Sequence, residues 1–499
     1  MTRFANDSSR RHPSHQDTTS QRLWRRQIVV VTLGWLLAGM LVCGHAQTVQ
    51  PLPIGTNAGG IVAAIAAQSD GSVVVGGLFS SINNVPRNNI ARLKPDGSVD
   101  MTWNPNADQE VRALAVSAST IYVGGNFSSI GGQPRAFLAA IDANSGQATG
   151  WNPAPNLPSV EALAISDDRN TVYAGGFFTQ IGALPRNYIA AIDAASGVAT
   201  SWNPGTNGYV RGLTLNGNVL YAIGNFTLVA GQARTQIARF NGDGTLDATW
   251  NPAPDNAAVK ALVVTAGTAF VGGQFLHIGG QPYAYLAALD ASAGSSGASL
   301  PWNPVSHSDV YAIAVAGSVV YVGGTFAQIG GQARANIAAI DASSGLATGW
   351  NPMAGGTVVY TIAVVGARVY VAGDFTTMAG QSRSGLAALG LAASTTVPGA
   401  PTIGAASAIG KDHATISFAP PADNGGSAII SYTVSCTASS IATTVASGSA
   451  SPITITGLTY LATYACSVQA NNAVGSSLPS ATIDFTPGDL IFSDGFDGS

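Results

Sequence analysis

Val111–Pro153 reads VRALAVSASTIYVGGNFSSIGGQPRAFLAAIDANSGQATGWNP, and this pattern decides the fold of most of the chain. Its Gly-x-Phe segment occurs seven times, at intervals of 48 to 51 residues. The seven phenylalanines are Phe79, Phe127, Phe178, Phe226, Phe275, Phe326 and Phe375. Trp-Asn-Pro occurs six times, beginning at Trp103, Trp151, Trp202, Trp250, Trp302 and Trp350. A repeat of this length indicates one supersecondary unit copied along an array.

Each copy divides into four short strands. In the quoted copy we expect strands over Val111–Val116, Ile121–Phe127, Phe137–Ile141 and Ala148–Asn152, because turn-forming residues separate these runs. Four strands per repeat and seven repeats predict an all-β fold, a seven-bladed β-propeller over residues 47–392. The repeated glycine pair in the second strand would let neighbouring blades approach closely, because glycine has no side chain to hold them apart.

The two ends of the array favour a closed ring. The seventh copy stops after Leu386–Leu389 and lacks Trp-Asn-Pro. Thr48–Asn57 precedes the first copy as the Trp-Asn-Pro segments precede later copies. We therefore expect residues 48–57 to supply the outer strand of the last blade, which would remove an open sheet edge.

The copies resemble the delta-60 repeat, a propeller-type repeat of bacterial secreted proteins. The resemblance is carried by the GGxF strand, the GGQPR loop and the Asp-x-x-Gly turn, and Arg92–Asp100 (RLKPDGSVD) is its closest match. It covers about residues 60–390 and implies a fold but no established chemistry.

Residues 1–46 have the order of a secretory signal peptide. Six arginines lie within residues 1–26, an apolar run follows over Ile28–Val42, and small residues lead up to Ala46. That run is shorter than the ~20 residues that a membrane-spanning helix needs. We therefore expect an exported protein, secreted, at the cell surface or periplasmic, with no membrane span in the mature chain.

Two other kinds of signal are weaker fits. Arg25-Arg26 resembles a twin-arginine signal, whereas a lipoprotein signal would need a small residue before Cys43, and Val42 stands there. Removing residues 1–46 removes six of 21 Lys and Arg and two of 25 Asp and Glu, which leaves a net charge of −8. With only 9% charged residues, the composition excludes a charge-driven disordered chain and a basic nucleic-acid binder.

Residues 393–487 contain a linker and a second domain. Its characteristic residues are Pro420-Pro421, Asp423–Gly426, Tyr432, Leu458, Tyr464, Ala470, Asn472, Gly475 and Pro479. With these residues, the segment 398–487 resembles a fibronectin type III domain. Phe418 stands where the family usually has a buried tryptophan. The resemblance implies a seven-stranded sandwich that acts as a spacer or docking module.

Cys436 and Cys466 should lie on adjacent strands of that sandwich. In an exported protein we expect them to form a disulfide, with two free thiols or a metal site as the alternatives. Gly488–Ser499 resembles a short tail of some Gram-negative secreted proteins, and a frayed acidic terminus explains it equally well.

An arginine recurs near the end of the second-to-third strand connection. The series is Arg87, Arg135, Arg186, Arg234, Arg334 and Arg383, with Tyr283 in the remaining copy. A ring of guanidinium groups could attract acidic glycans. Repetition in nearly every copy favours a structural role instead, in which each arginine donates to backbone carbonyls or pairs with an acid.

The second residue of the inner strand differs between copies. It is Ala63, Arg112, Glu161, Arg211, Lys260, Tyr311 and Tyr360, and the preceding connections also differ, as at His307 and Asp309. These residues would ring the mouth of the central channel. Mixed charges with two tyrosines suit a polar ligand such as a sugar or a peptide, although drift at a solvated position would give the same variation.

Motifs for chemistry are absent from the sequence. His277, His307 and His413 fall in separate units, no nucleophile or phosphate-binding motif occurs, and hairpin turns explain the Asp-Gly pairs better than calcium loops do. We expect no cofactor and no metal.

The leading hypothesis is an exported, non-catalytic binding or adhesion protein. It would be a monomer whose propeller face holds an extracellular glycan or protein. One alternative is a polysaccharide-active hydrolase or lyase, which would need paired carboxylates; Glu110 and Glu161 are the only glutamates after residue 46. The other is a purely architectural cell-surface component.

Overall fold

The computed structural model describes residues 60–255, 257–391, 397–408, 410–421, 423–425, 429–439, 441–472 and 474–488. These residues form β-strands and no helix, so none of their elements is a helix that could cross a membrane. The predicted signal peptide, the predicted outer strand 48–57 and residues 489–499 of the tail lie outside the described residues.

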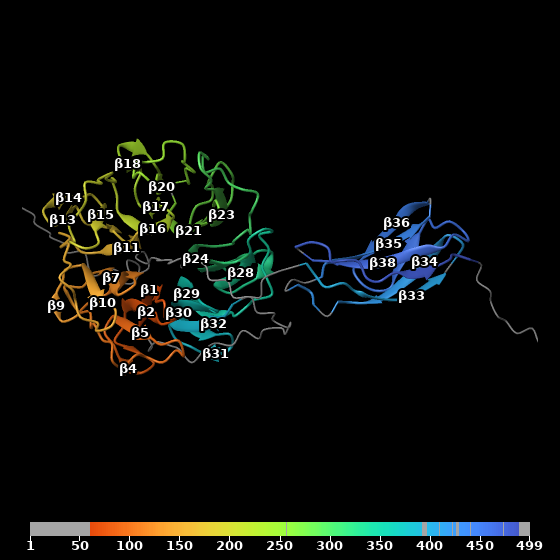
Figure 1. The fold of residues 1–499 in the computed structure, drawn as a ribbon, viewed down its shortest axis with the longest axis horizontal. Coiled ribbons are helices and arrows are strands. Elements are labelled where there is room, and N and C mark those ends of the chain that lie inside the picture. Colours follow the sequence, from red (N-terminus) through yellow and green to blue (C-terminus); the bar gives the residue numbers. More distant parts are fainter. Residues whose placement is uncertain are drawn as a thin grey trace, which may run out of the picture.

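Seven antiparallel sheets with three main strands each follow one another through residues 61–390. They are β1 (Ile61–Ala67), β2 (Val73–Leu78) and β5 (Ile90–Leu93); β6 (Val111–Ser117), β7 (Thr120–Gly125) and β10 (Leu138–Asp142); β11 (Val160–Ile165), β12 (Thr171–Gly176) and β15 (Ile189–Asp193); β16 (Val210–Asn216), β17 (Val219–Gly224) and β20 (Ile237–Phe240); β21 (Val259–Thr265), β22 (Thr268–Gly273) and β23 (Leu286–Asp290); β24 (Val310–Ala316), β25 (Val319–Gly324) and β28 (Ile337–Asp341); and β29 (Ala354–Val365), β30 (Arg368–Met378) and β32 (Leu386–Gly390). Figure 1 shows the sheets around a common centre, with their first strands innermost. The predicted all-β, propeller-like architecture is confirmed.

The predicted fourth strand is reduced to a single bridge. In the quoted copy only Ile141 and Ala148 pair, because the chain then turns away and the indole Nε1 of Trp151 donates to the carbonyl of Asp193 in the next sheet at 3.0 Å. Pro153, two residues later, has no N–H to extend a ladder. Trp-Asn-Pro therefore joins neighbouring blades more than it builds an outer strand. Equivalent bonds run from Trp202, Trp250, Trp302 and Trp350.

Close packing between neighbouring sheets agrees with the first glycine of the pair in five of the seven second strands; the fourth and seventh sheets have Ile223 and Ala372 there. A Cβ atom at Gly124 would lie 2.6 Å from Cγ1 of Val160, the first residue of the next inner strand. The predicted close approach at the glycine pair is confirmed. The first and seventh sheets also pack together, because Val62 and Ile65 share one hydrophobic cluster with Tyr370 and Leu386.

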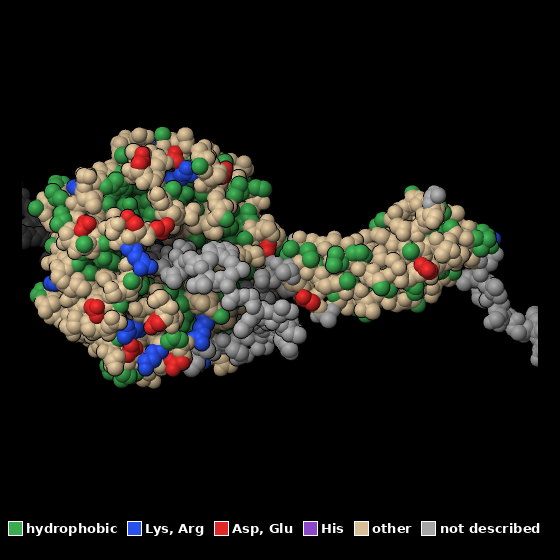
Figure 2. Space-filling model, viewed as in Figure 1, with side chains coloured by type: hydrophobic (Ala, Val, Ile, Leu, Met, Phe, Trp, Pro, Cys, Tyr) green, Lys and Arg blue, Asp and Glu red, His purple; other side chains and the backbone are tan. Residues whose placement is uncertain are grey.

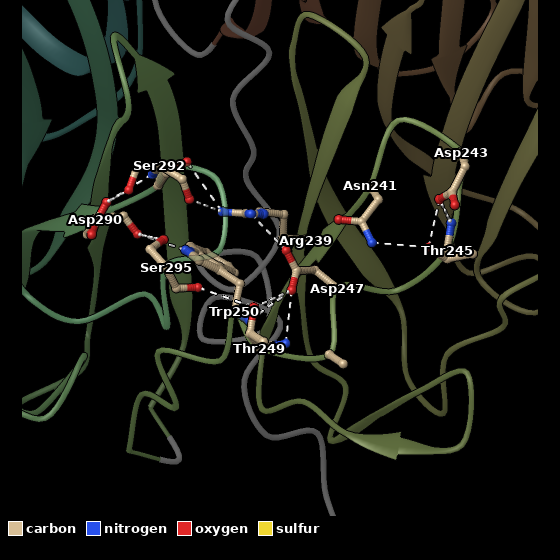
Figure 3. Close-up of polar contacts among 12 residues, drawn as sticks. Arg239, Asn241, Asp243, Thr245, Asp247, Thr249, Trp250, Asp290, Ser292 and Ser295 are labelled. Atoms are coloured by element: carbon tan, nitrogen blue, oxygen red, sulfur yellow. Dashed lines mark hydrogen bonds and ion pairs between the residues drawn. The ribbon is translucent and has the colours of Figure 1, made fainter.

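In two sheets an arginine forms an ion pair and also donates a hydrogen bond to the sheet that follows; Figure 3 shows one of them. Arg239 on β20 pairs with Asp247 at 2.8 Å, lies over the ring of Trp250, and donates to the carbonyl of Ser292 in the next sheet at 3.0 Å. Arg92 and Asp100 form the same pair in the first sheet at 2.6 Å. The pair helps to hold the pKa of Asp100 down at about 2; burial alone would raise it, but hydrogen bonds from Thr102 and the guanidinium of Arg92 stabilise the carboxylate.

The connection that leads into the first strand of a blade contacts the connection between its second and third strands. The connection into β6 bonds to the short hairpin of β8 (Ser129–Ile130) and β9 (Gln133–Pro134), through the N–H of Gly131 and the carbonyl of Pro105 at 2.7 Å. Similar two-residue hairpins are β3 (Ser81–Ile82) with β4 (Val85–Pro86), β13 (Gln180–Ile181) with β14 (Leu184–Pro185), β18 (Leu228–Val229) with β19 (Gln232–Ala233), and β26 (Gln328–Ile329) with β27 (Gln332–Ala333); β31 (Gln381–Ser382) pairs with β30.

Residues 402–485 form a sandwich of two antiparallel sheets. One contains β33 (Thr402–Ala408), β34 (His413–Ala419) and β37 (Ile453–Thr456); the other contains β35 (Ser431–Ala438), β36 (Ile441–Gly448), β38 (Tyr464–Asn471) and β39 (Ile483–Phe485). Phe418 is buried and packs 4.6 Å from the ring of Tyr432, so it fills the predicted core position. Cys436 and Cys466 lie opposite each other on β35 and β38 and form the predicted disulfide.

Few charges interrupt the surface. On the face drawn in Figure 2, acidic and basic side chains are few, and several of them gather at the lower edge of the propeller. This agrees with the 9% of charged residues in the chain. The few charged side chains that the fold buries are therefore candidates for a specific role.

Candidate ligand-binding site

A β-bulge occurs near the start of every inner strand. The register between the first and second strand skips one residue in each of the seven sheets. The skipped residues are Ala63, Arg112, Glu161, Arg211, Lys260, Tyr311 and Tyr360, the same seven that vary between the copies. A bulge redirects the side chain of the extra residue, and bulges often lie beside functional sites. We call these seven residues the bulge ring.

The bulge ring is buried. Six members are at most 5% exposed, and Tyr311 is partly exposed. Burial argues against drift at a solvated position, because a charged side chain in the interior costs free energy unless it is paired. What each charged member contacts therefore decides what the ring can do.

Arg112 neutralises one part of the ring. Its Nη1 lies 2.9 Å from Oε1 of Glu161, in the next blade, and its Nη2 lies 2.8 Å from Oε2 of Glu110. Burial opposes its charge, but the two carboxylates raise the pKa of Arg112 above its ordinary value. Ser159 also donates to Glu161. This part of the ring is an internal ion-pair network.

Arg211 has a poorer set of partners. Its Nη2 donates to the hydroxyl of Tyr209 at 2.5 Å and to Oδ1 of Asn225 at 3.4 Å, while Nη1 is buried and has no hydrogen-bond partner. The guanidinium lies 5.2 Å from the ring centre of Tyr209, which stacks on Phe177 at 4.2 Å. The aromatic pair fixes the side chain without neutralising it.

Lys260 lies between Arg211 and Tyr311. Its Nζ is 5.8 Å from the ring centre of Tyr311, in the next blade. Burial, with a further contribution from the charge of Arg211, lowers the pKa of Lys260 to about 7, and Asp309 opposes the shift. The ammonium therefore titrates near neutral pH.

Asp309 is already engaged by neutral donors. Its Oδ2 accepts from the hydroxyl of Tyr311 at 3.0 Å and from Nε2 of Gln274 at 2.7 Å. Burial and the carboxylate of Asp309 raise the pKa of Tyr311. Tyr311 also meets Tyr360 of the seventh sheet edge to face, with ring centres 6.0 Å apart.

The structure joins most of the predicted residues but not all. Contacts run from blade to blade through Arg112 and Glu161, and through Lys260, Tyr311 and Tyr360. Asp309 belongs to the second group. His307 is exposed, and its backbone N–H donates to the carbonyl of Gln328 at 3.3 Å.

The repeated arginines bind backbone and not one another. In Arg234, Nη1 donates to the carbonyl of Ala233 at 2.7 Å and Nη2 to the carbonyl of Asp247 at 2.7 Å, which fastens the loop to the outer segment of its own blade. The same pattern occurs at Arg87, Arg135, Arg186 and Arg334. This geometry favours the structural role for the series.

Sequence reasoning did not single out Asn225, which contacts Arg211, or Gln274, which contacts Asp309. Both occupy the variable position of the Gly-Gly-x-Phe segment or its equivalent, directly after the second strand. The other copies have Leu78, Asn126, Phe177, Thr325 and Asp374 there. Variation between copies at this position was the available signal. Among the described residues, no group of three or more His, Cys, Asp or Glu side chains could hold a metal ion.

Comparison with known families supports the assignment of both domains. A family model described as a domain of unknown function (DUF5122) beta-propeller matches residues 68–102 and 216–249. These two stretches hold the pairs Arg92–Asp100 and Arg239–Asp247, and the other sheets have Ala at the arginine position. A fibronectin type III model matches residues 399–486. The chain contains DUF5122-type propeller repeats and a fibronectin type III domain.

Solved structures give only distant matches. The computationally designed Ika8 protein is 12% identical, with 68% of this chain and 100% of that chain covered and a TM-score of 0.43. The extracellular domain of the one-component system BT4673 from B. thetaiotaomicron is 11% identical, with 89% and 59% covered and a TM-score of 0.43. A human fourth FNIII domain is 25% identical, with 20% and 88% covered and a TM-score of 0.18. The search of curated proteins found no match.

The combination of modules limits the range of functions. Propeller repeats, a fibronectin type III domain and a disulfide fit an extracellular protein that binds a partner or builds a structure.

Proposed function

We propose that this protein is an exported, non-catalytic binding protein and that the bulge ring is its ligand site. The observation that carries the proposal is that one backbone feature, the bulge, occurs in all seven sheets while its residue is of five different types. Every inner strand has the bulge, whereas the bulged residue is cationic, anionic, aromatic or small. A geometry that repeats while its side chains differ is expected where a fold presents a site.

The composition of the ring suits a polar ligand. Arg211 and Lys260 offer donors, and Tyr311 and Tyr360 offer flat apolar faces with hydroxyl groups. Binding sites commonly combine aromatic walls with a few placed polar groups. The fibronectin type III domain would then act as a spacer or docking module for a monomeric, secreted or surface-located chain.

Binding is favoured over hydrolysis by the state of the two glutamates. Glu110 and Glu161 both pair with Arg112, at 2.8 and 2.9 Å. A glycosidase needs one protonated carboxyl group and one free carboxylate facing the scissile bond. Two carboxylates that share one guanidinium are poorly suited to that division of roles.

Binding is also favoured over a purely architectural role. Nη1 of Arg211 is buried without a hydrogen bond, which lowers the stability of the folded protein. Such a cost is expected where a ligand completes the site.

The test is an array of glycans and peptides probed with the exported chain. Tyr360→Ala should abolish or strongly weaken any defined hit, because it removes a wall of the ring. Tyr460→Ala, an exposed tyrosine of the sandwich, is the matched control and should bind as the wild type does. A hit that survives Tyr360→Ala would place the ligand elsewhere, a blank array would favour the architectural role, and release of reducing ends from polysaccharides would favour the enzyme.

A further inference from the structure

We infer that Arg211 and Lys260 form an anion subsite that takes the carboxylate of an acidic saccharide. This inference rests on the proposed function and specifies the class of ligand. It depends on how charge is distributed in the bulge ring and on one unsatisfied donor.

Charge is unevenly divided around the ring. Arg112 pairs with two carboxylates, those of Glu110 and Glu161. Arg211 and Lys260 act on each other electrostatically, and the carboxylate of Asp309 acts on Lys260 in the opposite sense. Buried charge of one sign attracts a counter-ion, because desolvation strengthens the interaction.

Arg211 holds a donor ready for that counter-ion. Arg211 is only 3% exposed, and its Nη1 has no hydrogen-bond partner. Several other arginines of the described chain leave a buried Nε without a partner, so Nε does not distinguish the site. Among the described residues, Arg211 alone has a terminal guanidinium nitrogen in this state.

Asp309 does not supply the missing partner of Nη1 in Arg211. Its Oδ2 already accepts hydrogen bonds from Tyr311 and Gln274. A second carboxylate, brought by a ligand, would accept from Nη1 of Arg211 and pair with the ammonium of Lys260. Charge-assisted bonds of this kind are among the strongest that a protein makes with a small ligand.

Tyrosines around the subsite favour a sugar as the bearer of the carboxylate. Tyr209 is covered by Phe177 and Arg211, whereas Tyr311, which is partly exposed, lies against Lys260 and Tyr360. Tyrosine offers an apolar ring face for the C–H face of a pyranose and a hydroxyl for its hydroxyls. A hexuronate carries its carboxylate, hydroxyls and apolar face on one small ring, which matches these groups better than an acidic peptide does.

The experiment titrates the full exported chain with trigalacturonate, with neutral galactotriose and with a triglutamate peptide by calorimetry at pH 6.5. We expect trigalacturonate to bind at least about tenfold more tightly than galactotriose. Arg211→Gln should weaken trigalacturonate binding by about tenfold or more, and Arg211→Lys should restore part of it. Lys94→Gln makes the same change in net charge at an exposed turn and should leave affinity within about twofold.

Each outcome decides the inference. Equal affinity for the charged and neutral trisaccharides, no trigalacturonate binding, or retention of binding in Arg211→Gln overturns the anion subsite. Tighter, Arg211-dependent binding of triglutamate overturns the assignment to a saccharide. An array ligand that needs Tyr360 but not Arg211 overturns the subsite while sustaining the proposed function. Thermal melts of each variant establish that it is folded.

Discussion

Two kinds of arginine occur in the propeller, and they differ in how completely they are satisfied. Arg234 repeats in the equivalent place of most blades and donates through both terminal nitrogens to backbone carbonyls. Arg211 stands at a position that holds five residue types in seven blades, and one of its terminal nitrogens has no partner. Both are buried. Arg112 occupies the same variable position as Arg211 but pairs with two carboxylates, so an unsatisfied donor distinguishes Arg211 within the ring.

The largest expected effect concerns the arginine that links two blades. Arg239→Ala should lower the free energy of unfolding by about 3 kcal/mol, because it leaves the carboxylate of Asp247 buried without its cation. Chemical denaturation of the full chain measures the change. Asp247 keeps its bonds from Thr249 and Trp250, so the fold itself should persist.

Other blades supply the control for this change. The N–H of Asp247 bonds to the carbonyl of Arg239, and Thr149 and Ala140 form the same bond in the second sheet. Arg239→Ala combined with Asp247→Thr copies that pair and should recover most of the lost stability. If the double variant were no more stable than the single one, the ion pair would not be the source of the loss.

The second prediction contrasts the two arginines directly. Arg234→Gln should lower the free energy of unfolding by about 2 kcal/mol, because the buried carbonyl of Asp247 and the partly buried carbonyl of Ala233 lose their donor. Arg211→Gln should be neutral or stabilising, because it removes a buried cation whose Nη1 is unsatisfied. Parallel urea titrations compare them. A comparable loss in both variants would abolish the distinction between repeated and variable arginines.

The smallest expected effect is the pH dependence of Lys260. Its pKa is about 7 in the folded chain and near 10.5 when unfolded, so between these values the unfolded state binds the extra proton and stability rises with pH. Lys260→Met should therefore stabilise the protein by at least about 1 kcal/mol more at pH 6 than at pH 9. Melting curves at the two pH values test this, and a difference of the opposite sign would show that Lys260 is better paired than its surroundings indicate.

Much of the fold was predictable because it depends on local and repeated signals. The glycine pair, the turn residues and the Gly-x-Phe spacing predicted the strands, and the all-β class followed from them. The outer strand was the exception, since the indole of Trp151 bonds to the next blade instead of continuing a ladder. A single copy could not reveal this, because the partner lies in the following copy.

The sequence by itself determined the repeat, the strands within it, the sandwich with its disulfide, and which positions differ between copies. Tertiary structure alone decided how the differing side chains are paired. Glu161 contacts Arg112, and Tyr311 contacts Lys260, although the two residues of each pair are about 50 positions apart and lie in neighbouring blades. Each contact forms because the bulges of the two blades face each other. Pairing at that range depends on distances of a few ångströms, and hydrogen bonding and ion pairing vary steeply over such distances.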